Sequence, residues 1–286
     1  VGAFAGYAGL VLAVGIIGYA VLLHRRVLDN PRVRFAVTAG WVLGLTGAIT
    51  RALVAAADAT GARISALGPG SLSVAAGDPE FRAKAAAVAL WTVGGLAVVA
   101  LRTRGGNALA RPVWQVLGPV LALELLRFTS VTADRSLDST TTVASLVHLG
   151  AMTLWLGGLV TLLLERDRMS QRDLRRVLPR FSRLAFGAVT AVVITGIVLA
   201  VAYLATPADL LGTGYGRLLL AKTALLAAIL VAARRSQRWV ARHLPTNPPT
   251  ASHGSVRTLW CAVTVEICLA VAVLGVAAAL VTAPGG

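Results

Sequence analysis

One short stretch of the sequence carries side chains that are well suited to bind a metal ion. His148, Met152 and Trp155 follow one another at intervals of four and three residues, so on a helix all three share one face. Imidazole and thioether groups are borderline and soft ligands that suit copper. A histidine beside a methionine can equally be an ordinary packing contact between helices, and the spacing leaves both interpretations open.

Other ionisable side chains also lie inside apolar segments, where a central charge costs about 2.5–3.5 kcal/mol on insertion scales. Such residues are candidates for a function or for structural ion pairs. Besides His148, they are Arg51, Glu124, Arg127, Lys222 and Glu266. Cys261 and Cys268 flank Glu266 and could form a second soft site, although buried cysteine usually serves as a small hydrophobic residue.

These charged residues allow two explanations. Arg127 and Lys222 have long side chains that can extend to the outer lipid headgroups, and Glu124 could form a structural ion pair with Arg51 or Arg127. The alternative is an outward-facing polar cavity lined by these groups, with His148 as a ligand. Both explanations predict that the helices pack with these faces inward.

Transmembrane helices are the elements that must position these side chains. Of the 286 residues, 57% are hydrophobic and 14% are charged, whereas a soluble domain carries about 25% charged residues. A spanning helix needs about 20 mainly apolar residues, and eight segments qualify. They are Val1–Leu23, Phe35–Ala57, Ala83–Leu101, Pro112–Ser130, Val143–Leu164, Leu184–Ala205, Gly216–Ala233 and Thr258–Thr282. We predict an all-α membrane protein with eight transmembrane helices, in which residues 1–286 form a single domain in the lipid bilayer.

Arginines in the loops orient these helices. The first, third, fifth and seventh loops are rich in arginine, whereas the loops between them are nearly neutral. Basic residues concentrate in cytoplasmic loops, so the N-terminus and the C-terminus are both predicted outside. In this orientation every intramembrane ionisable group except Glu266 lies in the outer half of the membrane. The formal charge of +15 then reflects topology, and no nucleic-acid partner is expected.

Three blocks of the sequence resemble a known family. The stretch from His148 to Gly158 is similar to the His-x6-Trp-x-Gly-Gly signature of the CopD copper-resistance family. Arg180-Phe181-Ser182, followed by Thr195-Gly196, resembles a second segment of that family. Tyr215-Gly216-Arg217-Leu218-Leu219, followed by Lys222, resembles a third. The blocks stand in the order of the family and cover the predicted fifth to seventh helices.

The resemblance implies a multi-pass protein of the inner (plasma) membrane that acts in copper import or tolerance. It implies a bound copper ion with His148 as a contact, and Met152 lies one turn away on the same face. It also implies a partner, which is an extracytoplasmic CopC-type copper-binding protein or a fused domain of that type. A chain that starts at Val1 outside the membrane would suit such a fusion. No nucleotide-binding loop, Ser-His-Asp set or HExxH motif is present, so no enzyme is expected.

Two other classes of function compete with copper handling. Many family members carry a Gly-His pair near the outer end of the fourth helix, whereas residues 126–132 of this chain contain no histidine. A membrane scaffold or assembly protein would instead use Arg51, Arg127 and Lys222 to bind a partner or an anionic ligand in a cationic outer cavity. A b-type haem needs two axial histidines, and His148 is the only histidine inside a predicted span, so no haem is expected.

Overall fold

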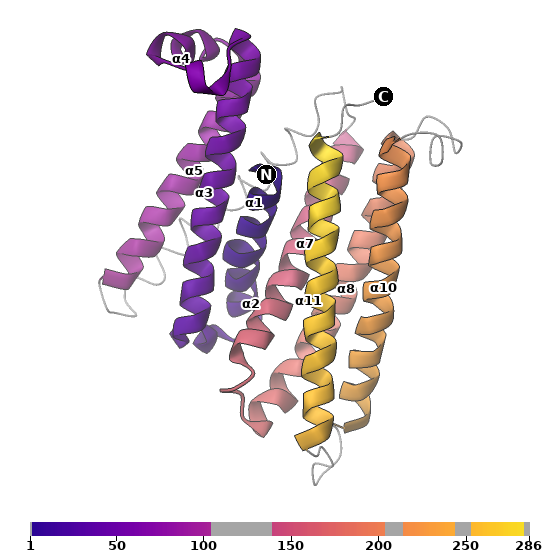
Figure 1. The fold of residues 1–286 in the computed structure, drawn as a ribbon. Helices are drawn as coiled ribbons and strands as arrows, with labels where there is room; N and C mark the ends of the chain where they lie inside the picture. The colour runs from indigo at the N-terminus through magenta and orange to yellow at the C-terminus, as the bar shows by residue number, and fades with distance from the viewer. Residues whose placement is uncertain (1, 104–138, 204–213, 244–252, 283–286) are drawn as a thin grey trace.

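The computed structural model describes residues 2–103, 139–203, 214–243 and 253–282, which form a bundle of long helices without a β-strand in these ranges (Figure 1). The predicted all-α class is therefore confirmed. Six helices in the described ranges are long and apolar enough to cross a membrane. They cover Gly2–Leu22, Pro31–Thr60, Ser139–Glu165, Arg172–Ala202, Gly216–Arg235 and Trp260–Ala278.

The amino-terminal elements begin with a helix that is continuous but not uniform. It consists of α1 (Gly2–Leu10), the π-helical turn η1 (Val11–Gly15) and α2 (Ile16–Leu22). The short turn η2 (Arg25–Asp29) leads to α3 (Pro31–Thr60). The turn η3 (Ile64–Ala66), α4 (Pro69–Ala75) and α5 (Pro79–Thr103) follow.

In the described part of the carboxy-terminal region there are four long helices: α7 (Ser139–Glu165), α8 (Gln171–Tyr203), α10 (Gly214–His243) and α11 (His253–Thr282). The helices α10 and α11 pack along each other as a hairpin. The helix α11 also contacts α7 and α1, whereas α10 makes few contacts with α8. The start of α1 and the end of α11 lie at the same end of the bundle (Figure 1).

The number of spans stays a prediction. The predicted third span corresponds to α5, which is a long helix but is not among the six that qualify by length and hydropathy. The predicted fourth span, Pro112–Ser130, lies outside the described residues together with Glu124 and Arg127. The count of eight and the outside location of both termini are therefore left as expectations.

Glycines bring the first helix and α3 into backbone contact. A methyl group placed on Gly9 would overlap the backbone of Gly44, and one on Gly47 would overlap the backbone of Gly6. Small residues that let helix backbones approach are typical of packing within membranes. The helices α3 and α5 are joined differently, because Trp41 and Trp91 meet edge to face with ring centroids 4.7 Å apart.

A second glycine contact joins the first helix to α7. Gly15, at the end of the π-helical turn, and Gly157 are so close that a methyl group on either would overlap the backbone of the other helix. Gly158, on the next position of α7, packs against the ring of Phe181 from α8. The helix α7 is thus fixed between the first helix and α8 at two consecutive residues.

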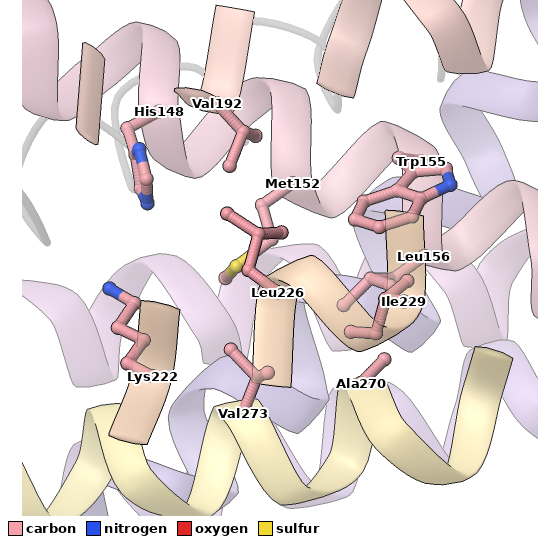
Figure 2. A pocket seen from close by; sticks show the side chains of 10 residues that line it. All are labelled: His148, Met152, Trp155, Leu156, Val192, Lys222, Leu226, Ile229, Ala270 and Val273. Carbon is pink, nitrogen blue, oxygen red and sulfur yellow. The ribbon is translucent and has the colours of Figure 1, made fainter. Parts of the chain in front are cut away.

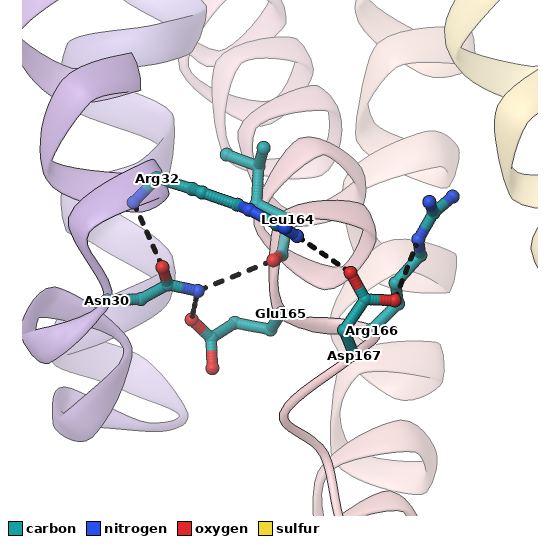
Figure 3. Close-up of polar contacts among 6 residues, drawn as sticks. All are labelled: Asn30, Arg32, Leu164, Glu165, Arg166 and Asp167. Atoms are coloured by element: carbon teal, nitrogen blue, oxygen red, sulfur yellow. Dashed lines mark hydrogen bonds and ion pairs between the residues drawn. The ribbon is translucent and has the colours of Figure 1, made fainter.

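Polar contacts join the start of α3 to the end of α7, at the opposite end of the bundle from the start of α1 (Figure 3). The buried Asn30 caps α3, because its Oδ1 accepts a hydrogen bond of 2.9 Å from the Arg32 N–H. Its Nδ2 donates to Glu165 Oε1 at 2.5 Å and to the Leu164 carbonyl at 3.4 Å. Arg32 Nη1 also lies 2.7 Å from Asp167 Oδ2, and this hydrogen bond lowers the pKa of the Asp167 carboxyl.

Candidate metal-binding site

His148 lies on α7, and its imidazole ring contacts two neighbouring residues of α8. Its Nδ1 is 3.0 Å from Thr195 Oγ1. The neighbouring Gly196 has no side chain, and its α-carbon region lies against the imidazole ring, because a methyl group there would be 3.5 Å from His148 Cε1. Thr195 therefore provides a polar partner for the ring, and Gly196 lies beside it.

A small cavity of about 30 Å³ opens beside His148, between helices α7, α8, α10 and α11 (Figure 2). A volume of this size holds one or two water-sized groups. The lining residues are His148, Met152, Trp155, Leu156, Val192, Lys222, Leu226, Ile229, Ala270 and Val273. Apart from His148 and Lys222 the lining side chains are almost entirely apolar.

Two potential copper ligands face this cavity. Figure 2 shows the imidazole nitrogen of His148 that is remote from α8 pointing towards Lys222, and the Met152 sulfur lying one helical turn deeper. Met152 is 7% exposed and Trp155 is 3% exposed, so the shared face predicted for α7 is buried. An imidazole nitrogen and a thioether suit copper, and thioether ligands favour Cu(I).

Lys222 lies across the cavity from His148, on α10 (Figure 2). As an ammonium it would repel a bound cation, and as a neutral amine it would offer a third nitrogen ligand. Within the described residues there is no group of three or more His, Cys, Asp or Glu side chains that could hold a metal ion. A metal bound at this cavity would therefore depend on the donors His148, Met152 and Lys222.

The comparison with known families fits this geometry. Residues 175–280 match the model of the family described as CopD, copper resistance protein D. This match supports membership of the CopD family. The match covers Thr195 and Lys222, whereas the α7 residues His148 and Met152 precede the matched range. No curated protein and no solved structure gives a significant match.

The structure explains why the three CopD-like sequence blocks occur together. Gly158 of the first block packs on Phe181 of the second, and His148 of the first block bonds to Thr195 of the second. Lys222 of the third block faces His148 across the cavity. One residue of each block, namely His148, Thr195 and Lys222, thus lies at or beside the cavity, which the sequence could not show because they come from three helices.

The remaining predicted site residues lie elsewhere. Arg51 is on α3 beside the first helix, where it interacts electrostatically with Tyr7, and it does not line the cavity. Glu266 is 3% exposed and lies one turn of α11 before Ala270, which does line the cavity. Cys261 and Cys268 are exposed, so they do not converge with the buried Glu266 on a second soft site.

Proposed function

We propose that this CopD-family protein takes copper ions from the outer side of the plasma (inner) membrane and passes them inward through the cavity of His148 and Met152. The main support is the convergence of an imidazole nitrogen and a thioether sulfur in one mainly apolar cavity between four helices. Copper is the cargo of this site, and no chemical conversion is involved. The role is therefore that of a conduit and not of an enzyme.

The composition of the cavity favours transfer over storage. A site with few protein ligands leaves positions at the metal open for exchange with a carrier. Lys222 opposes the bound cation whenever its amine is protonated, since two unit charges about 4 Å apart repel by about 4 kcal/mol at an effective dielectric constant of 20. Copper would then be bound weakly enough to leave, which is what a conduit needs.

The source of copper in this proposal is an extracytoplasmic CopC-type carrier, either a separate protein or a fused domain. The arginine pattern of the loops predicts that α7 starts on the outer side, so His148 would lie in the outer half of the membrane. Ions released by an outer carrier would reach His148 before Met152, because Met152 lies one turn deeper along α7.

A copper-binding titration with matched variants tests this proposal. His148→Ala and Met152→Leu each remove one donor, and each should weaken Cu(I) binding by about tenfold or more and lower copper accumulation in cells. Met169→Leu is the matched control, because Met169 is the only other methionine and lies outside the cavity. Unchanged Cu(I) affinity and unchanged accumulation in His148→Ala would refute the proposal.

An anionic ligand is the second candidate, and Lys222 is the observation that favours it. This candidate is weaker, because Lys222 is the only Lys or Arg among the cavity residues and Arg51 lies against the first helix. Phosphate binding that persists in His148→Ala and disappears in Lys222→Gln would support the anionic ligand over copper.

A further inference from the structure

We infer that Thr195 is a positioning residue that fixes the tautomer of His148. In this arrangement His148 carries its proton on Nδ1, and Nε2 is the nitrogen that binds copper. The inference rests on the proposed function for the role of Nε2. The tautomer itself follows from hydrogen bonds in the metal-free protein.

The direction of the hydrogen bonds decides the tautomer. A threonine hydroxyl has one proton to donate. Thr195 Oγ1 lies 2.6 Å from the Ala191 carbonyl oxygen and 3.4 Å from that of Val192, and a carbonyl oxygen can only accept. The hydroxyl proton therefore points along α8, and towards His148 the oxygen can only accept. At the separation of 3.0 Å, His148 Nδ1 must then be the donor.

The local structure of α8 holds this arrangement. Thr195 is 9% exposed, so water cannot easily replace either of its partners. The bond to a carbonyl one turn earlier is a regular threonine contact within helices, and the branched side chain restricts rotation about χ1. The next residue, Gly196, lies beside the imidazole ring, where an added methyl group would be in ordinary contact with it.

As a consequence, Nε2 of His148 presents a free lone pair to the cavity. With the proton on Nδ1, the unprotonated nitrogen is Nε2. Because Nδ1 is bonded to Thr195 of α8, Nε2 is the ring nitrogen remote from α8, and this nitrogen points into the cavity (Figure 2). The opposite tautomer would present an N–H group to an incoming cation. Metal-binding histidines usually donate their second N–H to a fixed partner, and loss of that partner typically weakens metal binding by 10–100-fold.

Two substitutions at one position separate this role from packing. Thr195→Val keeps the shape and removes the hydroxyl, whereas Thr195→Ser keeps the hydroxyl. Thr190→Val is the matched control, because Thr190 Oγ1 makes the same kind of bond to the Phe186 carbonyl at 2.9 Å on the exposed side of α8.

The first measurement is nitrogen-15 NMR of histidine-labelled protein without copper. The chain has four histidines, and the His148 signals are assigned by their loss in His148→Ala. The wild type, Thr195→Ser and Thr190→Val should show a protonated Nδ1 and an unprotonated Nε2. In Thr195→Val the His148 signals should shift towards the other tautomer or a mixture. A protonated Nε2 in the wild type, or an unchanged tautomer in Thr195→Val, would overturn the inference.

The second measurement is a Cu(I) competition titration of the same proteins. Thr195→Val should bind Cu(I) about 10–100-fold more weakly, and Thr195→Ser and Thr190→Val should bind as the wild type does. Equal affinity in Thr195→Val despite a changed tautomer would overturn the positioning role. If the wild type shows the Nδ1 tautomer but binds no Cu(I), the tautomer assignment stands and the proposed function fails.

Discussion

The first helix and α8 are both apolar enough to span a membrane, yet they are packed in different ways. In their most apolar stretches, 67% of the residues of the first helix are buried, against 11% in α8 and 11% in α10. The first helix is enclosed by α3 and α7 through contacts at glycine, whereas α8 exposes large apolar side chains. Among them are Phe186, Ile197 and Val201, which are 60–74% exposed and would face lipid.

The two regions therefore serve different purposes. The first helix, α3 and α5 form a tightly packed unit that fixes the position of α7 through Gly15 and Gly157. The cavity with His148 and Lys222 is on the other side of α7, where the helices α8 and α10 contact each other little. A binding site that must load and release an ion is expected in the region with the fewer packing constraints.

Removing Trp91 would damage the tightly packed unit and should have the largest effect on stability. Trp91 is 2% exposed and packs edge to face on Trp41. Large-to-small changes of buried aromatic residues cost about 3–5 kcal/mol, so Trp91→Ala should lower the thermal unfolding temperature strongly. Leu96→Ala on the same helix is the control, because Leu96 is 65% exposed and should change little.

Because the packed unit and the cavity are separate regions, folded Trp91→Ala protein should keep its copper affinity. The cavity has no lining residue from α3 or α5. Cu(I) titration of the folded fraction measures this directly. A loss of affinity equal to that of His148→Ala would show that the packed unit and the site are not separate.

Gly157 is where the two regions meet, and its substitution should have an intermediate effect on stability. In Gly157→Ala the added methyl group would overlap the backbone at Gly15, and overpacking of this kind costs about 1–3 kcal/mol. Because α7 carries His148, Cu(I) affinity should fall together with the unfolding temperature.

Gly150→Ala provides a control on the same helix, since a methyl group at Gly150 meets no atom within 4 Å. Its unfolding temperature and Cu(I) affinity should equal those of the wild type. If Gly150→Ala and Gly157→Ala behaved alike, the close approach of the first helix and α7 would not be what positions the site.

The smallest expected effect concerns the Arg32–Asp167 pair, which also joins the two regions. The hydrogen bond from Arg32 lowers the pKa of Asp167, so the stabilisation is present above the unfolded pKa of about 3.9. It is lost as the pH falls through the lower pKa of the folded state. Exposed pairs of this kind contribute little, and both side chains are more than half exposed.

Thermal unfolding of Asp167→Asn between about pH 7 and pH 3 measures this contribution. The variant should be slightly less stable than the wild type at neutral pH, and the difference should shrink as the solution becomes acidic. Asp29→Asn, which removes another exposed carboxylate outside the pair, is the matched control. If the difference in stability between Asp167→Asn and the wild type grew towards acid pH, the pKa of Asp167 would not be lowered in the folded state.

Much of the fold could be predicted from the sequence, because membrane spans depend on apolar length, which is a local property. The shared face of His148, Met152 and Trp155 could also be predicted, since it follows from helix geometry alone. The hydrogen bond between His148 and Thr195 could not be predicted, because it depends on which helix packs beside α7. The separation of Cys261 and Cys268 from Glu266 was missed because the rotation of α11 is set by its neighbours.

Some features had no sequence signal at all. The π-helical turn of Val11–Gly15 contains only common apolar residues and glycine, and such a turn is a response to tertiary packing. The burial of Asn30 follows from its contacts with Glu165 and Leu164, which are more than 130 residues away along the chain. An asparagine before a proline predicts a helix cap, but not a bond to a distant helix end.

The hairpin of α10 and α11 has a consequence for how copper affinity could be set. Lys222 belongs to the hairpin, whereas His148 and Thr195 do not, and the hairpin is joined to the rest mainly through α11. A rigid tilt of the hairpin would change the distance from the ammonium to the ion without disturbing the bond between His148 and Thr195. Bilayer thickness, which acts on helix tilt, would then tune the affinity of the site electrostatically.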